Sequence, residues 1–334
     1  MIKERKRTRT ETVLPALLIG TLSMLFAEVF SGASQAWFFN PLSLLLAFPL
    51  YMAHTLFFLW IALRLEKTSI RQLYLFGTIF GLYESWITKV LWAGYMDATG
   101  PGMGTLFGIA IPEFPVLVFF WHPIMAFIMP VLAYEALTGR AISTHGKILE
   151  KGRKKTAAII VLLAAIGTFI ANGNQFNILS VNLSVIGTLL IVLGLYHLSR
   201  KKDLKVFGFG RLGFGIVTAY LTLLYVGSFF LLFPGRIPQT PVPYIAILAF
   251  YAILAGLIKI SGKTGTRLVP LKTGQYSKKD FAKLAAVPIL SANLACLIPS
   301  MSISILFISY LTLTAIGTAI FAFVAYKTLR QRYF

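Results

Sequence analysis

The stretch FGTIFGLYESWITKVLW, residues 76–92, is apolar enough to belong to a membrane-spanning helix, and yet it carries Glu84 and Lys89. Similar apolar stretches of about 20 residues recur along the chain, and each is long enough to cross a bilayer core about 30 Å thick. Of the 334 residues, 57% are hydrophobic and only 13% are charged, whereas about a quarter of the residues in soluble domains are charged. The sequence therefore predicts an all-α, polytopic integral membrane protein.

About ten transmembrane helices are predicted from these stretches. They are expected near residues 13–32, 42–63, 73–93, 114–138, 157–172, 178–198, 212–233, 243–260, 284–300 and 303–325. With the N-terminus in the cytoplasm, all but two of the 31 Lys and Arg residues fall on the inner side, the exceptions being Lys89 and Arg236. This asymmetry follows the positive-inside rule and predicts a cell-membrane protein with both termini cytoplasmic. The net charge of +20 then indicates contact with membrane lipids rather than a nucleic-acid surface.

The ionisable residues inside the predicted spans are concentrated in the first part of the chain. We expect residues 1–140 to form a four-helix unit that carries them, 141–156 to form a basic cytoplasmic loop, and 157–334 to form an apolar six-helix bundle. The start of the chain also resembles a secretory signal, but its apolar run is long and contains Glu28, so we expect the first helix to be retained.

Five polar side chains are expected to converge in the outer half of the four-helix unit. By the predicted topology, Glu28 and Lys89 lie in the outer third of their helices, and His122 lies in an outer half. His54 and Glu84 lie near the middle of the membrane. A charge at the bilayer centre costs from about 3 to more than 10 kcal/mol, so such residues usually pair with one another or line water. We interpret the five residues as an outward-facing intramembrane site.

The positions of Glu84 and Lys89 on one helix predict different neighbours for them. They are five residues apart, which is about 140° around an α-helix. At least one of them must therefore find a partner on another helix. A neutralising pair of Lys89 with Glu84, Glu28 or Glu113 is one expectation.

Two glycines on the same stripe as Glu84 predict a close helix contact. Gly77 and Gly81 are four residues apart, and this spacing lets a second helix approach closely within a membrane. The four prolines of residues 112–130 predict a bent helix beside His122.

The candidate chemistry is acid–base chemistry centred on Glu84. With its neighbour Tyr83 it can serve as a general base or a proton carrier, and His54 or His122 is the candidate partner. The two histidines and a carboxylate would also suit a metal ion, although they lie on different helices and no local ligand spacing supports such a site. A structural ion pair between Glu84 and Lys89 is the remaining interpretation.

Three segments together resemble a family of uncharacterised prokaryotic multi-span proteins. They are AEVFSGASQAWFFNPLSLLLAFPLY, LYLFGTIFGLYESWITKVLW and WHPIMAFIMPVLAYE, within residues 27–135. The third helix of that family often reads Gly-Leu-x-Glu-Glu-Gly, where this chain has Ser85 and Trp86 after Glu84. The chain also has a distant analogy to CAAX-type intramembrane proteases, of whose scheme it keeps only Glu84, Lys89 and His122, in a different spacing.

Three functional hypotheses stay open at this point. The first is an intramembrane hydrolase-type enzyme acting on a lipid or peptide, with Glu84 activating water, His54 or His122 assisting it, and Lys89 as an electrostatic stabiliser. The second is a proton- or ion-coupled transporter of small solutes that uses Glu84, Glu28 and His54 as a relay. The third is a structural subunit whose charges pair with a partner protein.

Overall fold

The computed structural model describes residues 10–96, 98–199 and 202–330; the basic start of the chain (1–9), on which the topology prediction partly rests, lies outside them. Within the described residues, nine helical segments are long and apolar enough to cross a membrane, which confirms the all-α polytopic fold. They are α1 (Thr10–Met24) continuing as η1 (Leu25–Val29), η2 (Ser43–Ala47) continuing as α2 (Phe48–Arg64), η3 (Pro115–Ile128) continuing as α6 (Met129–Thr138), α8 (Arg153–Gly173), α9 (Ile178–Leu198), α10 (Arg211–Leu231), α11 (Val242–Ile260), α12 (Lys278–Leu297) and α13 (Pro299–Arg330).

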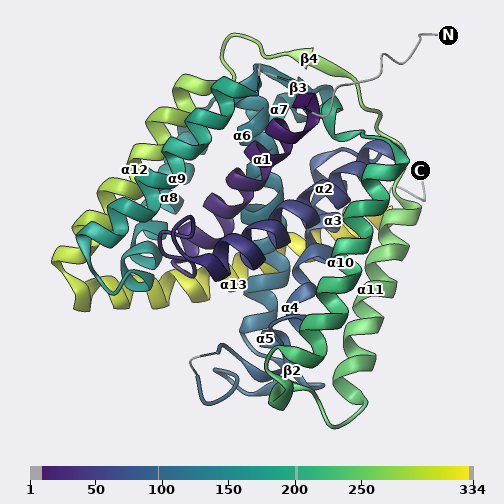
Figure 1. Ribbon diagram of the computed structural model, residues 1–334, viewed down its shortest axis with the longest axis vertical. Coiled ribbons are helices and arrows are strands. Elements are labelled where there is room, and N and C mark those ends of the chain that lie inside the picture. The colour runs from purple at the N-terminus through teal and green to yellow at the C-terminus, as the bar shows by residue number, and fades with distance from the viewer. Residues whose placement is uncertain (1–9, 97, 200–201, 331–334) are drawn as a thin grey trace.

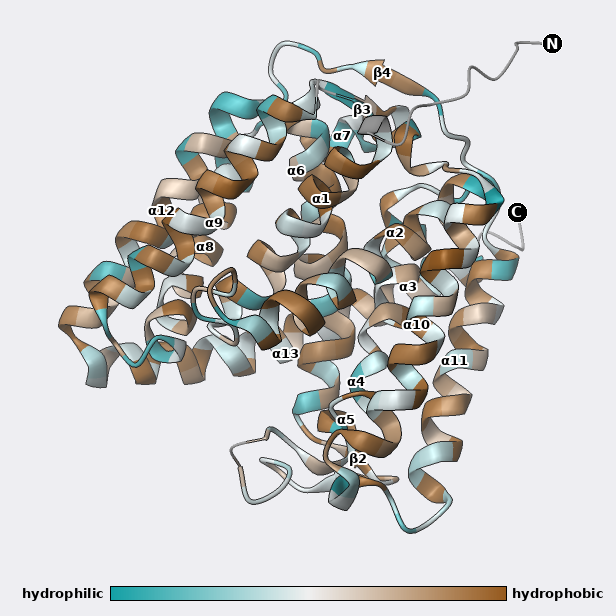
Figure 2. Ribbon diagram, in the orientation of Figure 1, coloured by the Kyte–Doolittle hydropathy of each residue, from teal (hydrophilic) through white to brown (hydrophobic). Residues whose placement is uncertain are grey.

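The long helices form two outer groups around a buried centre (Figure 1). Helices α8, α9 and α12 contact one another on one side, and α10 and α11 lie on the other. Between them, α1 packs on α2 and α6, and α3 (Ile70–Gly81) packs on η3. The long helix α13 contacts α8, η3 and α11, so it passes across both groups. Hydrophobic residues run along these helices, as Figure 2 shows, which suits them to a hydrocarbon environment.

The prediction of one continuous helix over residues 73–93 is wrong. The segment is divided into α3, the single turn α4 (Tyr83–Trp86) and the single turn α5 (Val90–Ala93). Lys89 has a φ of 59°, a left-handed conformation that costs a residue with a side chain about 1 kcal/mol or more. The break turns the Lys89 side chain toward α10, so the angular argument from a straight helix does not apply.

The predicted close contact at Gly77 and Gly81 is confirmed. A Cβ atom added to Gly77 would lie 2.5 Å from the Cα of Pro123, and one added to Gly81 would lie 3.1 Å from the Cβ of His122. Only hydrogen at these two positions lets α3 press directly on η3. The glycines therefore set His122 against the end of α3.

Loops at one end of the molecule, which we call the basic face, are joined into a layer. They are residues 65–69, 139–152 and 261–277, around β3 (Arg140–Ile142), η4 (Ser143–His145), α7 (Gly146–Leu149) and β4 (Leu268–Pro270). Strand β3 pairs antiparallel with β4, and Arg140 lies opposite Pro270. A second short segment, η5 (Leu204–Phe207), packs under α1 at this end. The charge pattern predicts that this face is cytoplasmic.

The opposite end, which we call the far face, is made of residues 94–96, 98–113 and 232–241. The first loop contains a hairpin of β1 (Thr105–Leu106) and β2 (Ile109–Ala110), and the second contains η6 (Pro234–Arg236). The guanidinium of Arg236 donates to the carbonyl oxygens of Gly94 and Tyr95, each at 2.8 Å. The two loops are thereby held together at the far face.

Two lysines each cap the last turn of an exposed helix, one at each face. At the basic face, the ammonium of Lys67 donates to the carbonyl oxygens of Ile258 (2.6 Å) and Ser261, at the end of α11. Near the far face, the ammonium of Lys89 donates to the carbonyl oxygens of Ser228 (2.7 Å) and Leu232, at the end of α10. The last carbonyls of a helix have no intrahelical partner and carry partial negative charge, so both cations stabilise a helix end.

Candidate functional site

Four helical segments bring the candidate side chains together in the buried centre. Glu28 comes from η1, Tyr51 from α2, Tyr83 and Glu84 from α4, and His122 from η3. Both η1 and η3 are π-helical, a conformation that is rare and frequent at functional sites. The wider turn of η1 is supported from η3, since the indole of Trp121 donates to the carbonyl oxygen of Ala27 at 2.8 Å.

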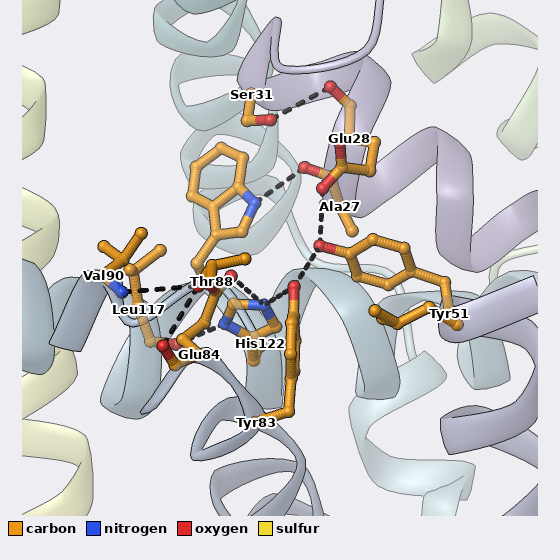
Figure 3. A network of polar contacts seen from close by, with 12 residues as sticks. Ala27, Glu28, Ser31, Tyr51, Tyr83, Glu84, Thr88, Val90, Leu117 and His122 are labelled. Carbon is orange, nitrogen blue, oxygen red and sulfur yellow. Dashed lines mark hydrogen bonds and ion pairs between the residues drawn. The ribbon is translucent and has the colours of Figure 1, made fainter. Parts of the chain in front are cut away.

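The first carboxylate of the site is held by two hydroxyl groups, of which Figure 3 shows that of Tyr51. The hydroxyl of Tyr51 donates to Oε1 of Glu28 at 2.6 Å, and the hydroxyl of Ser34 donates to Oε2 at 2.6 Å. The oxygen of Tyr51 lies 2.9 Å from the hydroxyl oxygen of Tyr83. Because a phenol both donates and accepts, Tyr51 can link Glu28 to Tyr83.

The second carboxylate is reached through the His122 ring. Nε2 of His122 lies 3.3 Å from the hydroxyl of Tyr83 and 3.4 Å from Oε1 of Glu84. Its Nδ1 lies 3.0 Å from the carbonyl oxygen of Leu117, which can only accept, so Nδ1 carries a proton. The hydroxyl of Thr88 donates to the Glu84 carboxylate from the other side.

These contacts form one continuous polar path, which we call the relay chain: Glu28, Tyr51, Tyr83, His122 and Glu84. Its three inner members are buried. Its two ends differ: Glu28 is half-buried, whereas Glu84 is buried like the inner members. A path of this kind can pass a proton between two carboxylates, because each inner member can give up one proton while it accepts another.

Lys89 does not pair with Glu84, Glu28 or Glu113, contrary to that expectation. Its ammonium donates to the helix-end carbonyls of α10 and lies 5.5 Å from the centre of the Phe229 ring. The physical reason is the break before α5, which points the side chain away from the relay chain. The broader expectation, that Glu84 and Lys89 reach different neighbouring helices, agrees with this arrangement.

His54 lies beside the relay chain and not in it. Its Nδ1 lies 2.8 Å from the carbonyl oxygen of Leu50, and its Nε2 lies 3.0 Å from the hydroxyl of Tyr225 on α10. Its ring stacks on Phe80 with 4.6 Å between ring centres, and 5.3 Å separates the centres of the His54 and Tyr83 rings. His54 therefore joins α10 to the wall of the site.

Sequence reasoning did not find Tyr51, Ser34 or Tyr225. Tyr51 had a usable signal, since it precedes His54 by three residues and so shares a helix face with it. Tyr225 lies in the part of the chain that was expected to act as an apolar scaffold, and only packing reveals its contact. Among the described residues, no three His, Cys, Asp or Glu side chains gather as metal ligands, so the considered two-His, one-carboxylate arrangement is not formed there.

Comparison with known proteins places these observations in a family. Residues 17–333 match the model of an uncharacterized membrane protein family. An uncharacterized protein of Archaeoglobus fulgidus is 40% identical over 155 residues, which are 45% of this chain and 48% of that protein, so the chain spans about half the length of that curated relative. No solved structure matches the chain. Because the family match extends over nearly all of the sequence, the chain belongs to this uncharacterized membrane protein family.

Proposed function

We propose that this protein is an intramembrane acid–base enzyme of the hydrolase type that acts on a lipid or peptide substrate. The observation that carries the proposal is the relay chain, because it connects Glu84 to Glu28 through buried groups that can all exchange protons. An enzyme of this class needs a base at the reacting atoms and a route by which the proton that the base takes up can leave.

In the proposed reaction, Glu84 is the general base. Its carboxylate accepts a proton from a water molecule while the water oxygen forms a bond to the carbonyl carbon or phosphorus of the substrate. The bond to the leaving group breaks, and the leaving group takes this proton from Glu84. The second proton of the water is released when the acid product ionises. It passes from Glu84 to Nε2 of His122, whose Nδ1 already carries a proton, and then through Tyr83 and Tyr51 toward Glu28.

Lys89 has no step in this proposal, because its ammonium is engaged by the carbonyls of α10. His54 is proposed as a positioning residue that holds Tyr225 beside Tyr83.

A second candidate is a proton-coupled transporter of small solutes. The half-buried end of the relay chain at Glu28 favours it, since a proton can enter a polar path from an accessible carboxylate and continue to a second carboxylate. Against it, the layer at the basic face is closed by a buried ion pair between His145 and Glu135, whose side chains are both 0% exposed.

Liposomes that contain the purified protein and a trapped pH-sensitive dye test both proposals. The liposomes are made from a total membrane lipid extract, and a library of membrane-anchored peptides is added. We expect new lipid or peptide masses in the mass spectrum, without loss of an imposed pH gradient. Turnover should fall by about 10²–10⁴-fold in Glu84→Gln.

Glu113→Gln is the matched control, because Glu113 is a second buried carboxylate and lies outside the relay chain. It is expected to keep the wild-type turnover. Loss of the pH gradient that requires Glu84, with no new product, would contradict the enzyme and favour the transporter. A mass spectrum and a gradient that both stay unchanged with all three proteins would contradict both proposals.

A further inference from the structure

Two adjoining hollows run along α10 on its side toward the site. The larger has a volume of about 300 Å³ and is lined by residues that include His54, Phe58, Thr218 and Tyr225. The smaller has a volume of about 200 Å³ and is lined mainly by aromatic residues, namely Trp86, Tyr225, Phe229 and Phe230. Tyr225 and Val226 line both, so the hollows adjoin along α10, and we call them together the α10 groove.

The α10 groove is open on the outer surface of α10, which is long and apolar enough to cross a membrane and so faces lipid there. Two of its lining side chains are largely exposed, Val226 at 55% and Phe230 at 63%. From Thr218 to Phe230 the helix rises about 18 Å, at 1.5 Å per residue. This length is close to half of a bilayer core of about 30 Å, which is the depth that the hydrocarbon chain of one leaflet occupies.

The groove lies next to the relay chain through His54, which lines the larger hollow. The hydroxyl of Tyr225 and Nε2 of His54 are 3.0 Å apart, and the His54 ring lies against the ring of Tyr83. Trp86, which lines the other end of the groove, donates from its indole to the hydroxyl of Tyr251 at 3.1 Å. A molecule lying in the groove would therefore have an apolar bed along α10 and one part next to His54 and Tyr225, beside the Tyr83 ring.

We propose that the α10 groove holds the hydrocarbon chain of the substrate, so that the substrate is a lipid or a lipid-linked molecule. This inference rests on the proposed function, and it adds the class of substrate. The chain enters sideways from the membrane, since the groove is open between α2 and α10. The headgroup or linkage then lies at His54 and Tyr225, next to the Tyr83 ring.

Photolabelling of the full chain in nanodiscs tests the groove without any assay of turnover. The probe is a phosphatidylcholine with a diazirine in the middle of one long acyl chain. After irradiation and digestion, the labelled residues are mapped by mass spectrometry. We expect adducts on residues 218–230 and at Phe57 and Phe58 to exceed those on the equally apolar, exposed face of α9 by about tenfold.

Val226→Phe fills the groove and is expected to lower this labelling by about tenfold, and Thr222→Phe is a second filling variant. Leu223→Phe is the matched control, because Leu223 is 73% exposed on the same helix and does not line the groove. Labelling spread evenly over all exposed helices, or labelling unchanged in both filling variants, would overturn the proposal.

Competition separates recognition of the hydrocarbon chain from recognition of the headgroup. Unlabelled long-chain phosphatidylcholine should reduce the groove adducts, whereas glycerophosphocholine, which has the same headgroup and no chains, should not. Reduction by glycerophosphocholine would contradict the proposal. Glu84→Gln is expected to keep the labelling, so a failed groove and a failed acid–base function give different results.

Discussion

Two buried pairs of a histidine and a glutamate lie at different depths of this molecule, and their hydrogen bonding differs. At the basic face, Nδ1 of His145 lies 2.9 Å from both carboxylate oxygens of Glu135, and its Nε2 lies 2.6 Å from the carbonyl oxygen of Thr68. In the site, Nε2 of His122 lies 3.4 Å from a single oxygen of Glu84.

The pair at the basic face is closed. Both nitrogens of His145 face oxygen atoms that accept, so both donate and the ring is protonated. The Glu135 carboxylate also accepts from the backbone N–H of Ile142 at 2.8 Å. Burial alone lowers the pKa of His145, but the Glu135 charge and the hydrogen bonds to Glu135 and Thr68 raise it, and the net direction is upward. This pair fastens the loops of the basic face.

The pair in the site is open. Nε2 of His122 is shared between Glu84 and Tyr83, so a proton there has two destinations. The same two residue types therefore stabilise a structure when each nitrogen of the histidine faces a single residue. They are suited to move a proton when one nitrogen faces two residues that can exchange it.

Interrupting the relay chain is the largest effect we expect. Tyr83→Phe keeps the ring and removes the hydroxyl that joins Tyr51 to His122. Product formation in the liposome assay should fall by about 10²–10⁴-fold. Tyr251→Phe is the control, because Tyr251 bonds Trp86 outside the relay chain. Wild-type turnover in Tyr83→Phe would contradict the open-pair interpretation.

Breaking the closed pair should instead affect folding. Glu135→Gln leaves His145 without its counter-charge in a fully buried position, and removal of one partner from a buried pair costs about 3–5 kcal/mol. Glu84→Gln, in the open pair, should cost about 1 kcal/mol. Denaturant unfolding in detergent measures both. Equal losses in the two variants would remove the distinction between the pairs.

The closed pair also predicts how stability depends on pH. The pKa of His145 is raised in the folded protein above its ordinary value of 6.5. Its contribution to stability is therefore complete below about pH 6.5 and is lost as the pH rises through the folded-state pKa. The difference in unfolding free energy between wild type and His145→Gln should shrink over that range, and a difference that grows with pH would contradict this assignment.

The two lysines that cap helix ends, Lys89 and Lys67, should differ in how many residues their removal makes exchange faster. Lys89→Met removes charged hydrogen bonds worth about 1.5–3 kcal/mol from the end of α10, a helix that is largely exposed. Hydrogen exchange should become faster at residues 228–232 while the rest of the chain is unchanged. Lys67→Met, the control at the basic face, should speed exchange at the end of α11 and also in the loops joined to it.

The smallest effect concerns the contact between α3 and η3 that positions His122. Gly77→Ala adds a methyl group 2.5 Å from the Cα of Pro123, and overpacking of this kind costs about 1–3 kcal/mol. Gly227→Ala is the control, because an added Cβ there meets no atom within 4 Å. Thermal unfolding compares the two. Unchanged stability in Gly77→Ala would mean that η3 can move away from α3, and His122 with it.

The sequence alone predicted the helices that cross the membrane and the family resemblance. Hydropathy is a local property, so long apolar runs are recognised directly in the sequence. Apart from the segment over 73–93, the eight spans predicted after the first differ little in position from the helices observed. The Gly77 and Gly81 contact was also predictable, because small residues four apart mark a close approach in any membrane helix. The division into residues 1–140, 141–156 and 157–334 stays a prediction.

The partners of the polar residues were decided only by the tertiary structure. The sequence indicated that Glu28, Glu84, His54 and His122 lie in the same region, because depth follows from position along a helix. It did not indicate which of them touch, because a contact depends on the rotation of each helix and on local breaks such as the one at Lys89. For that reason Tyr51, which was not predicted, belongs to the site, and Lys89, which was predicted, does not.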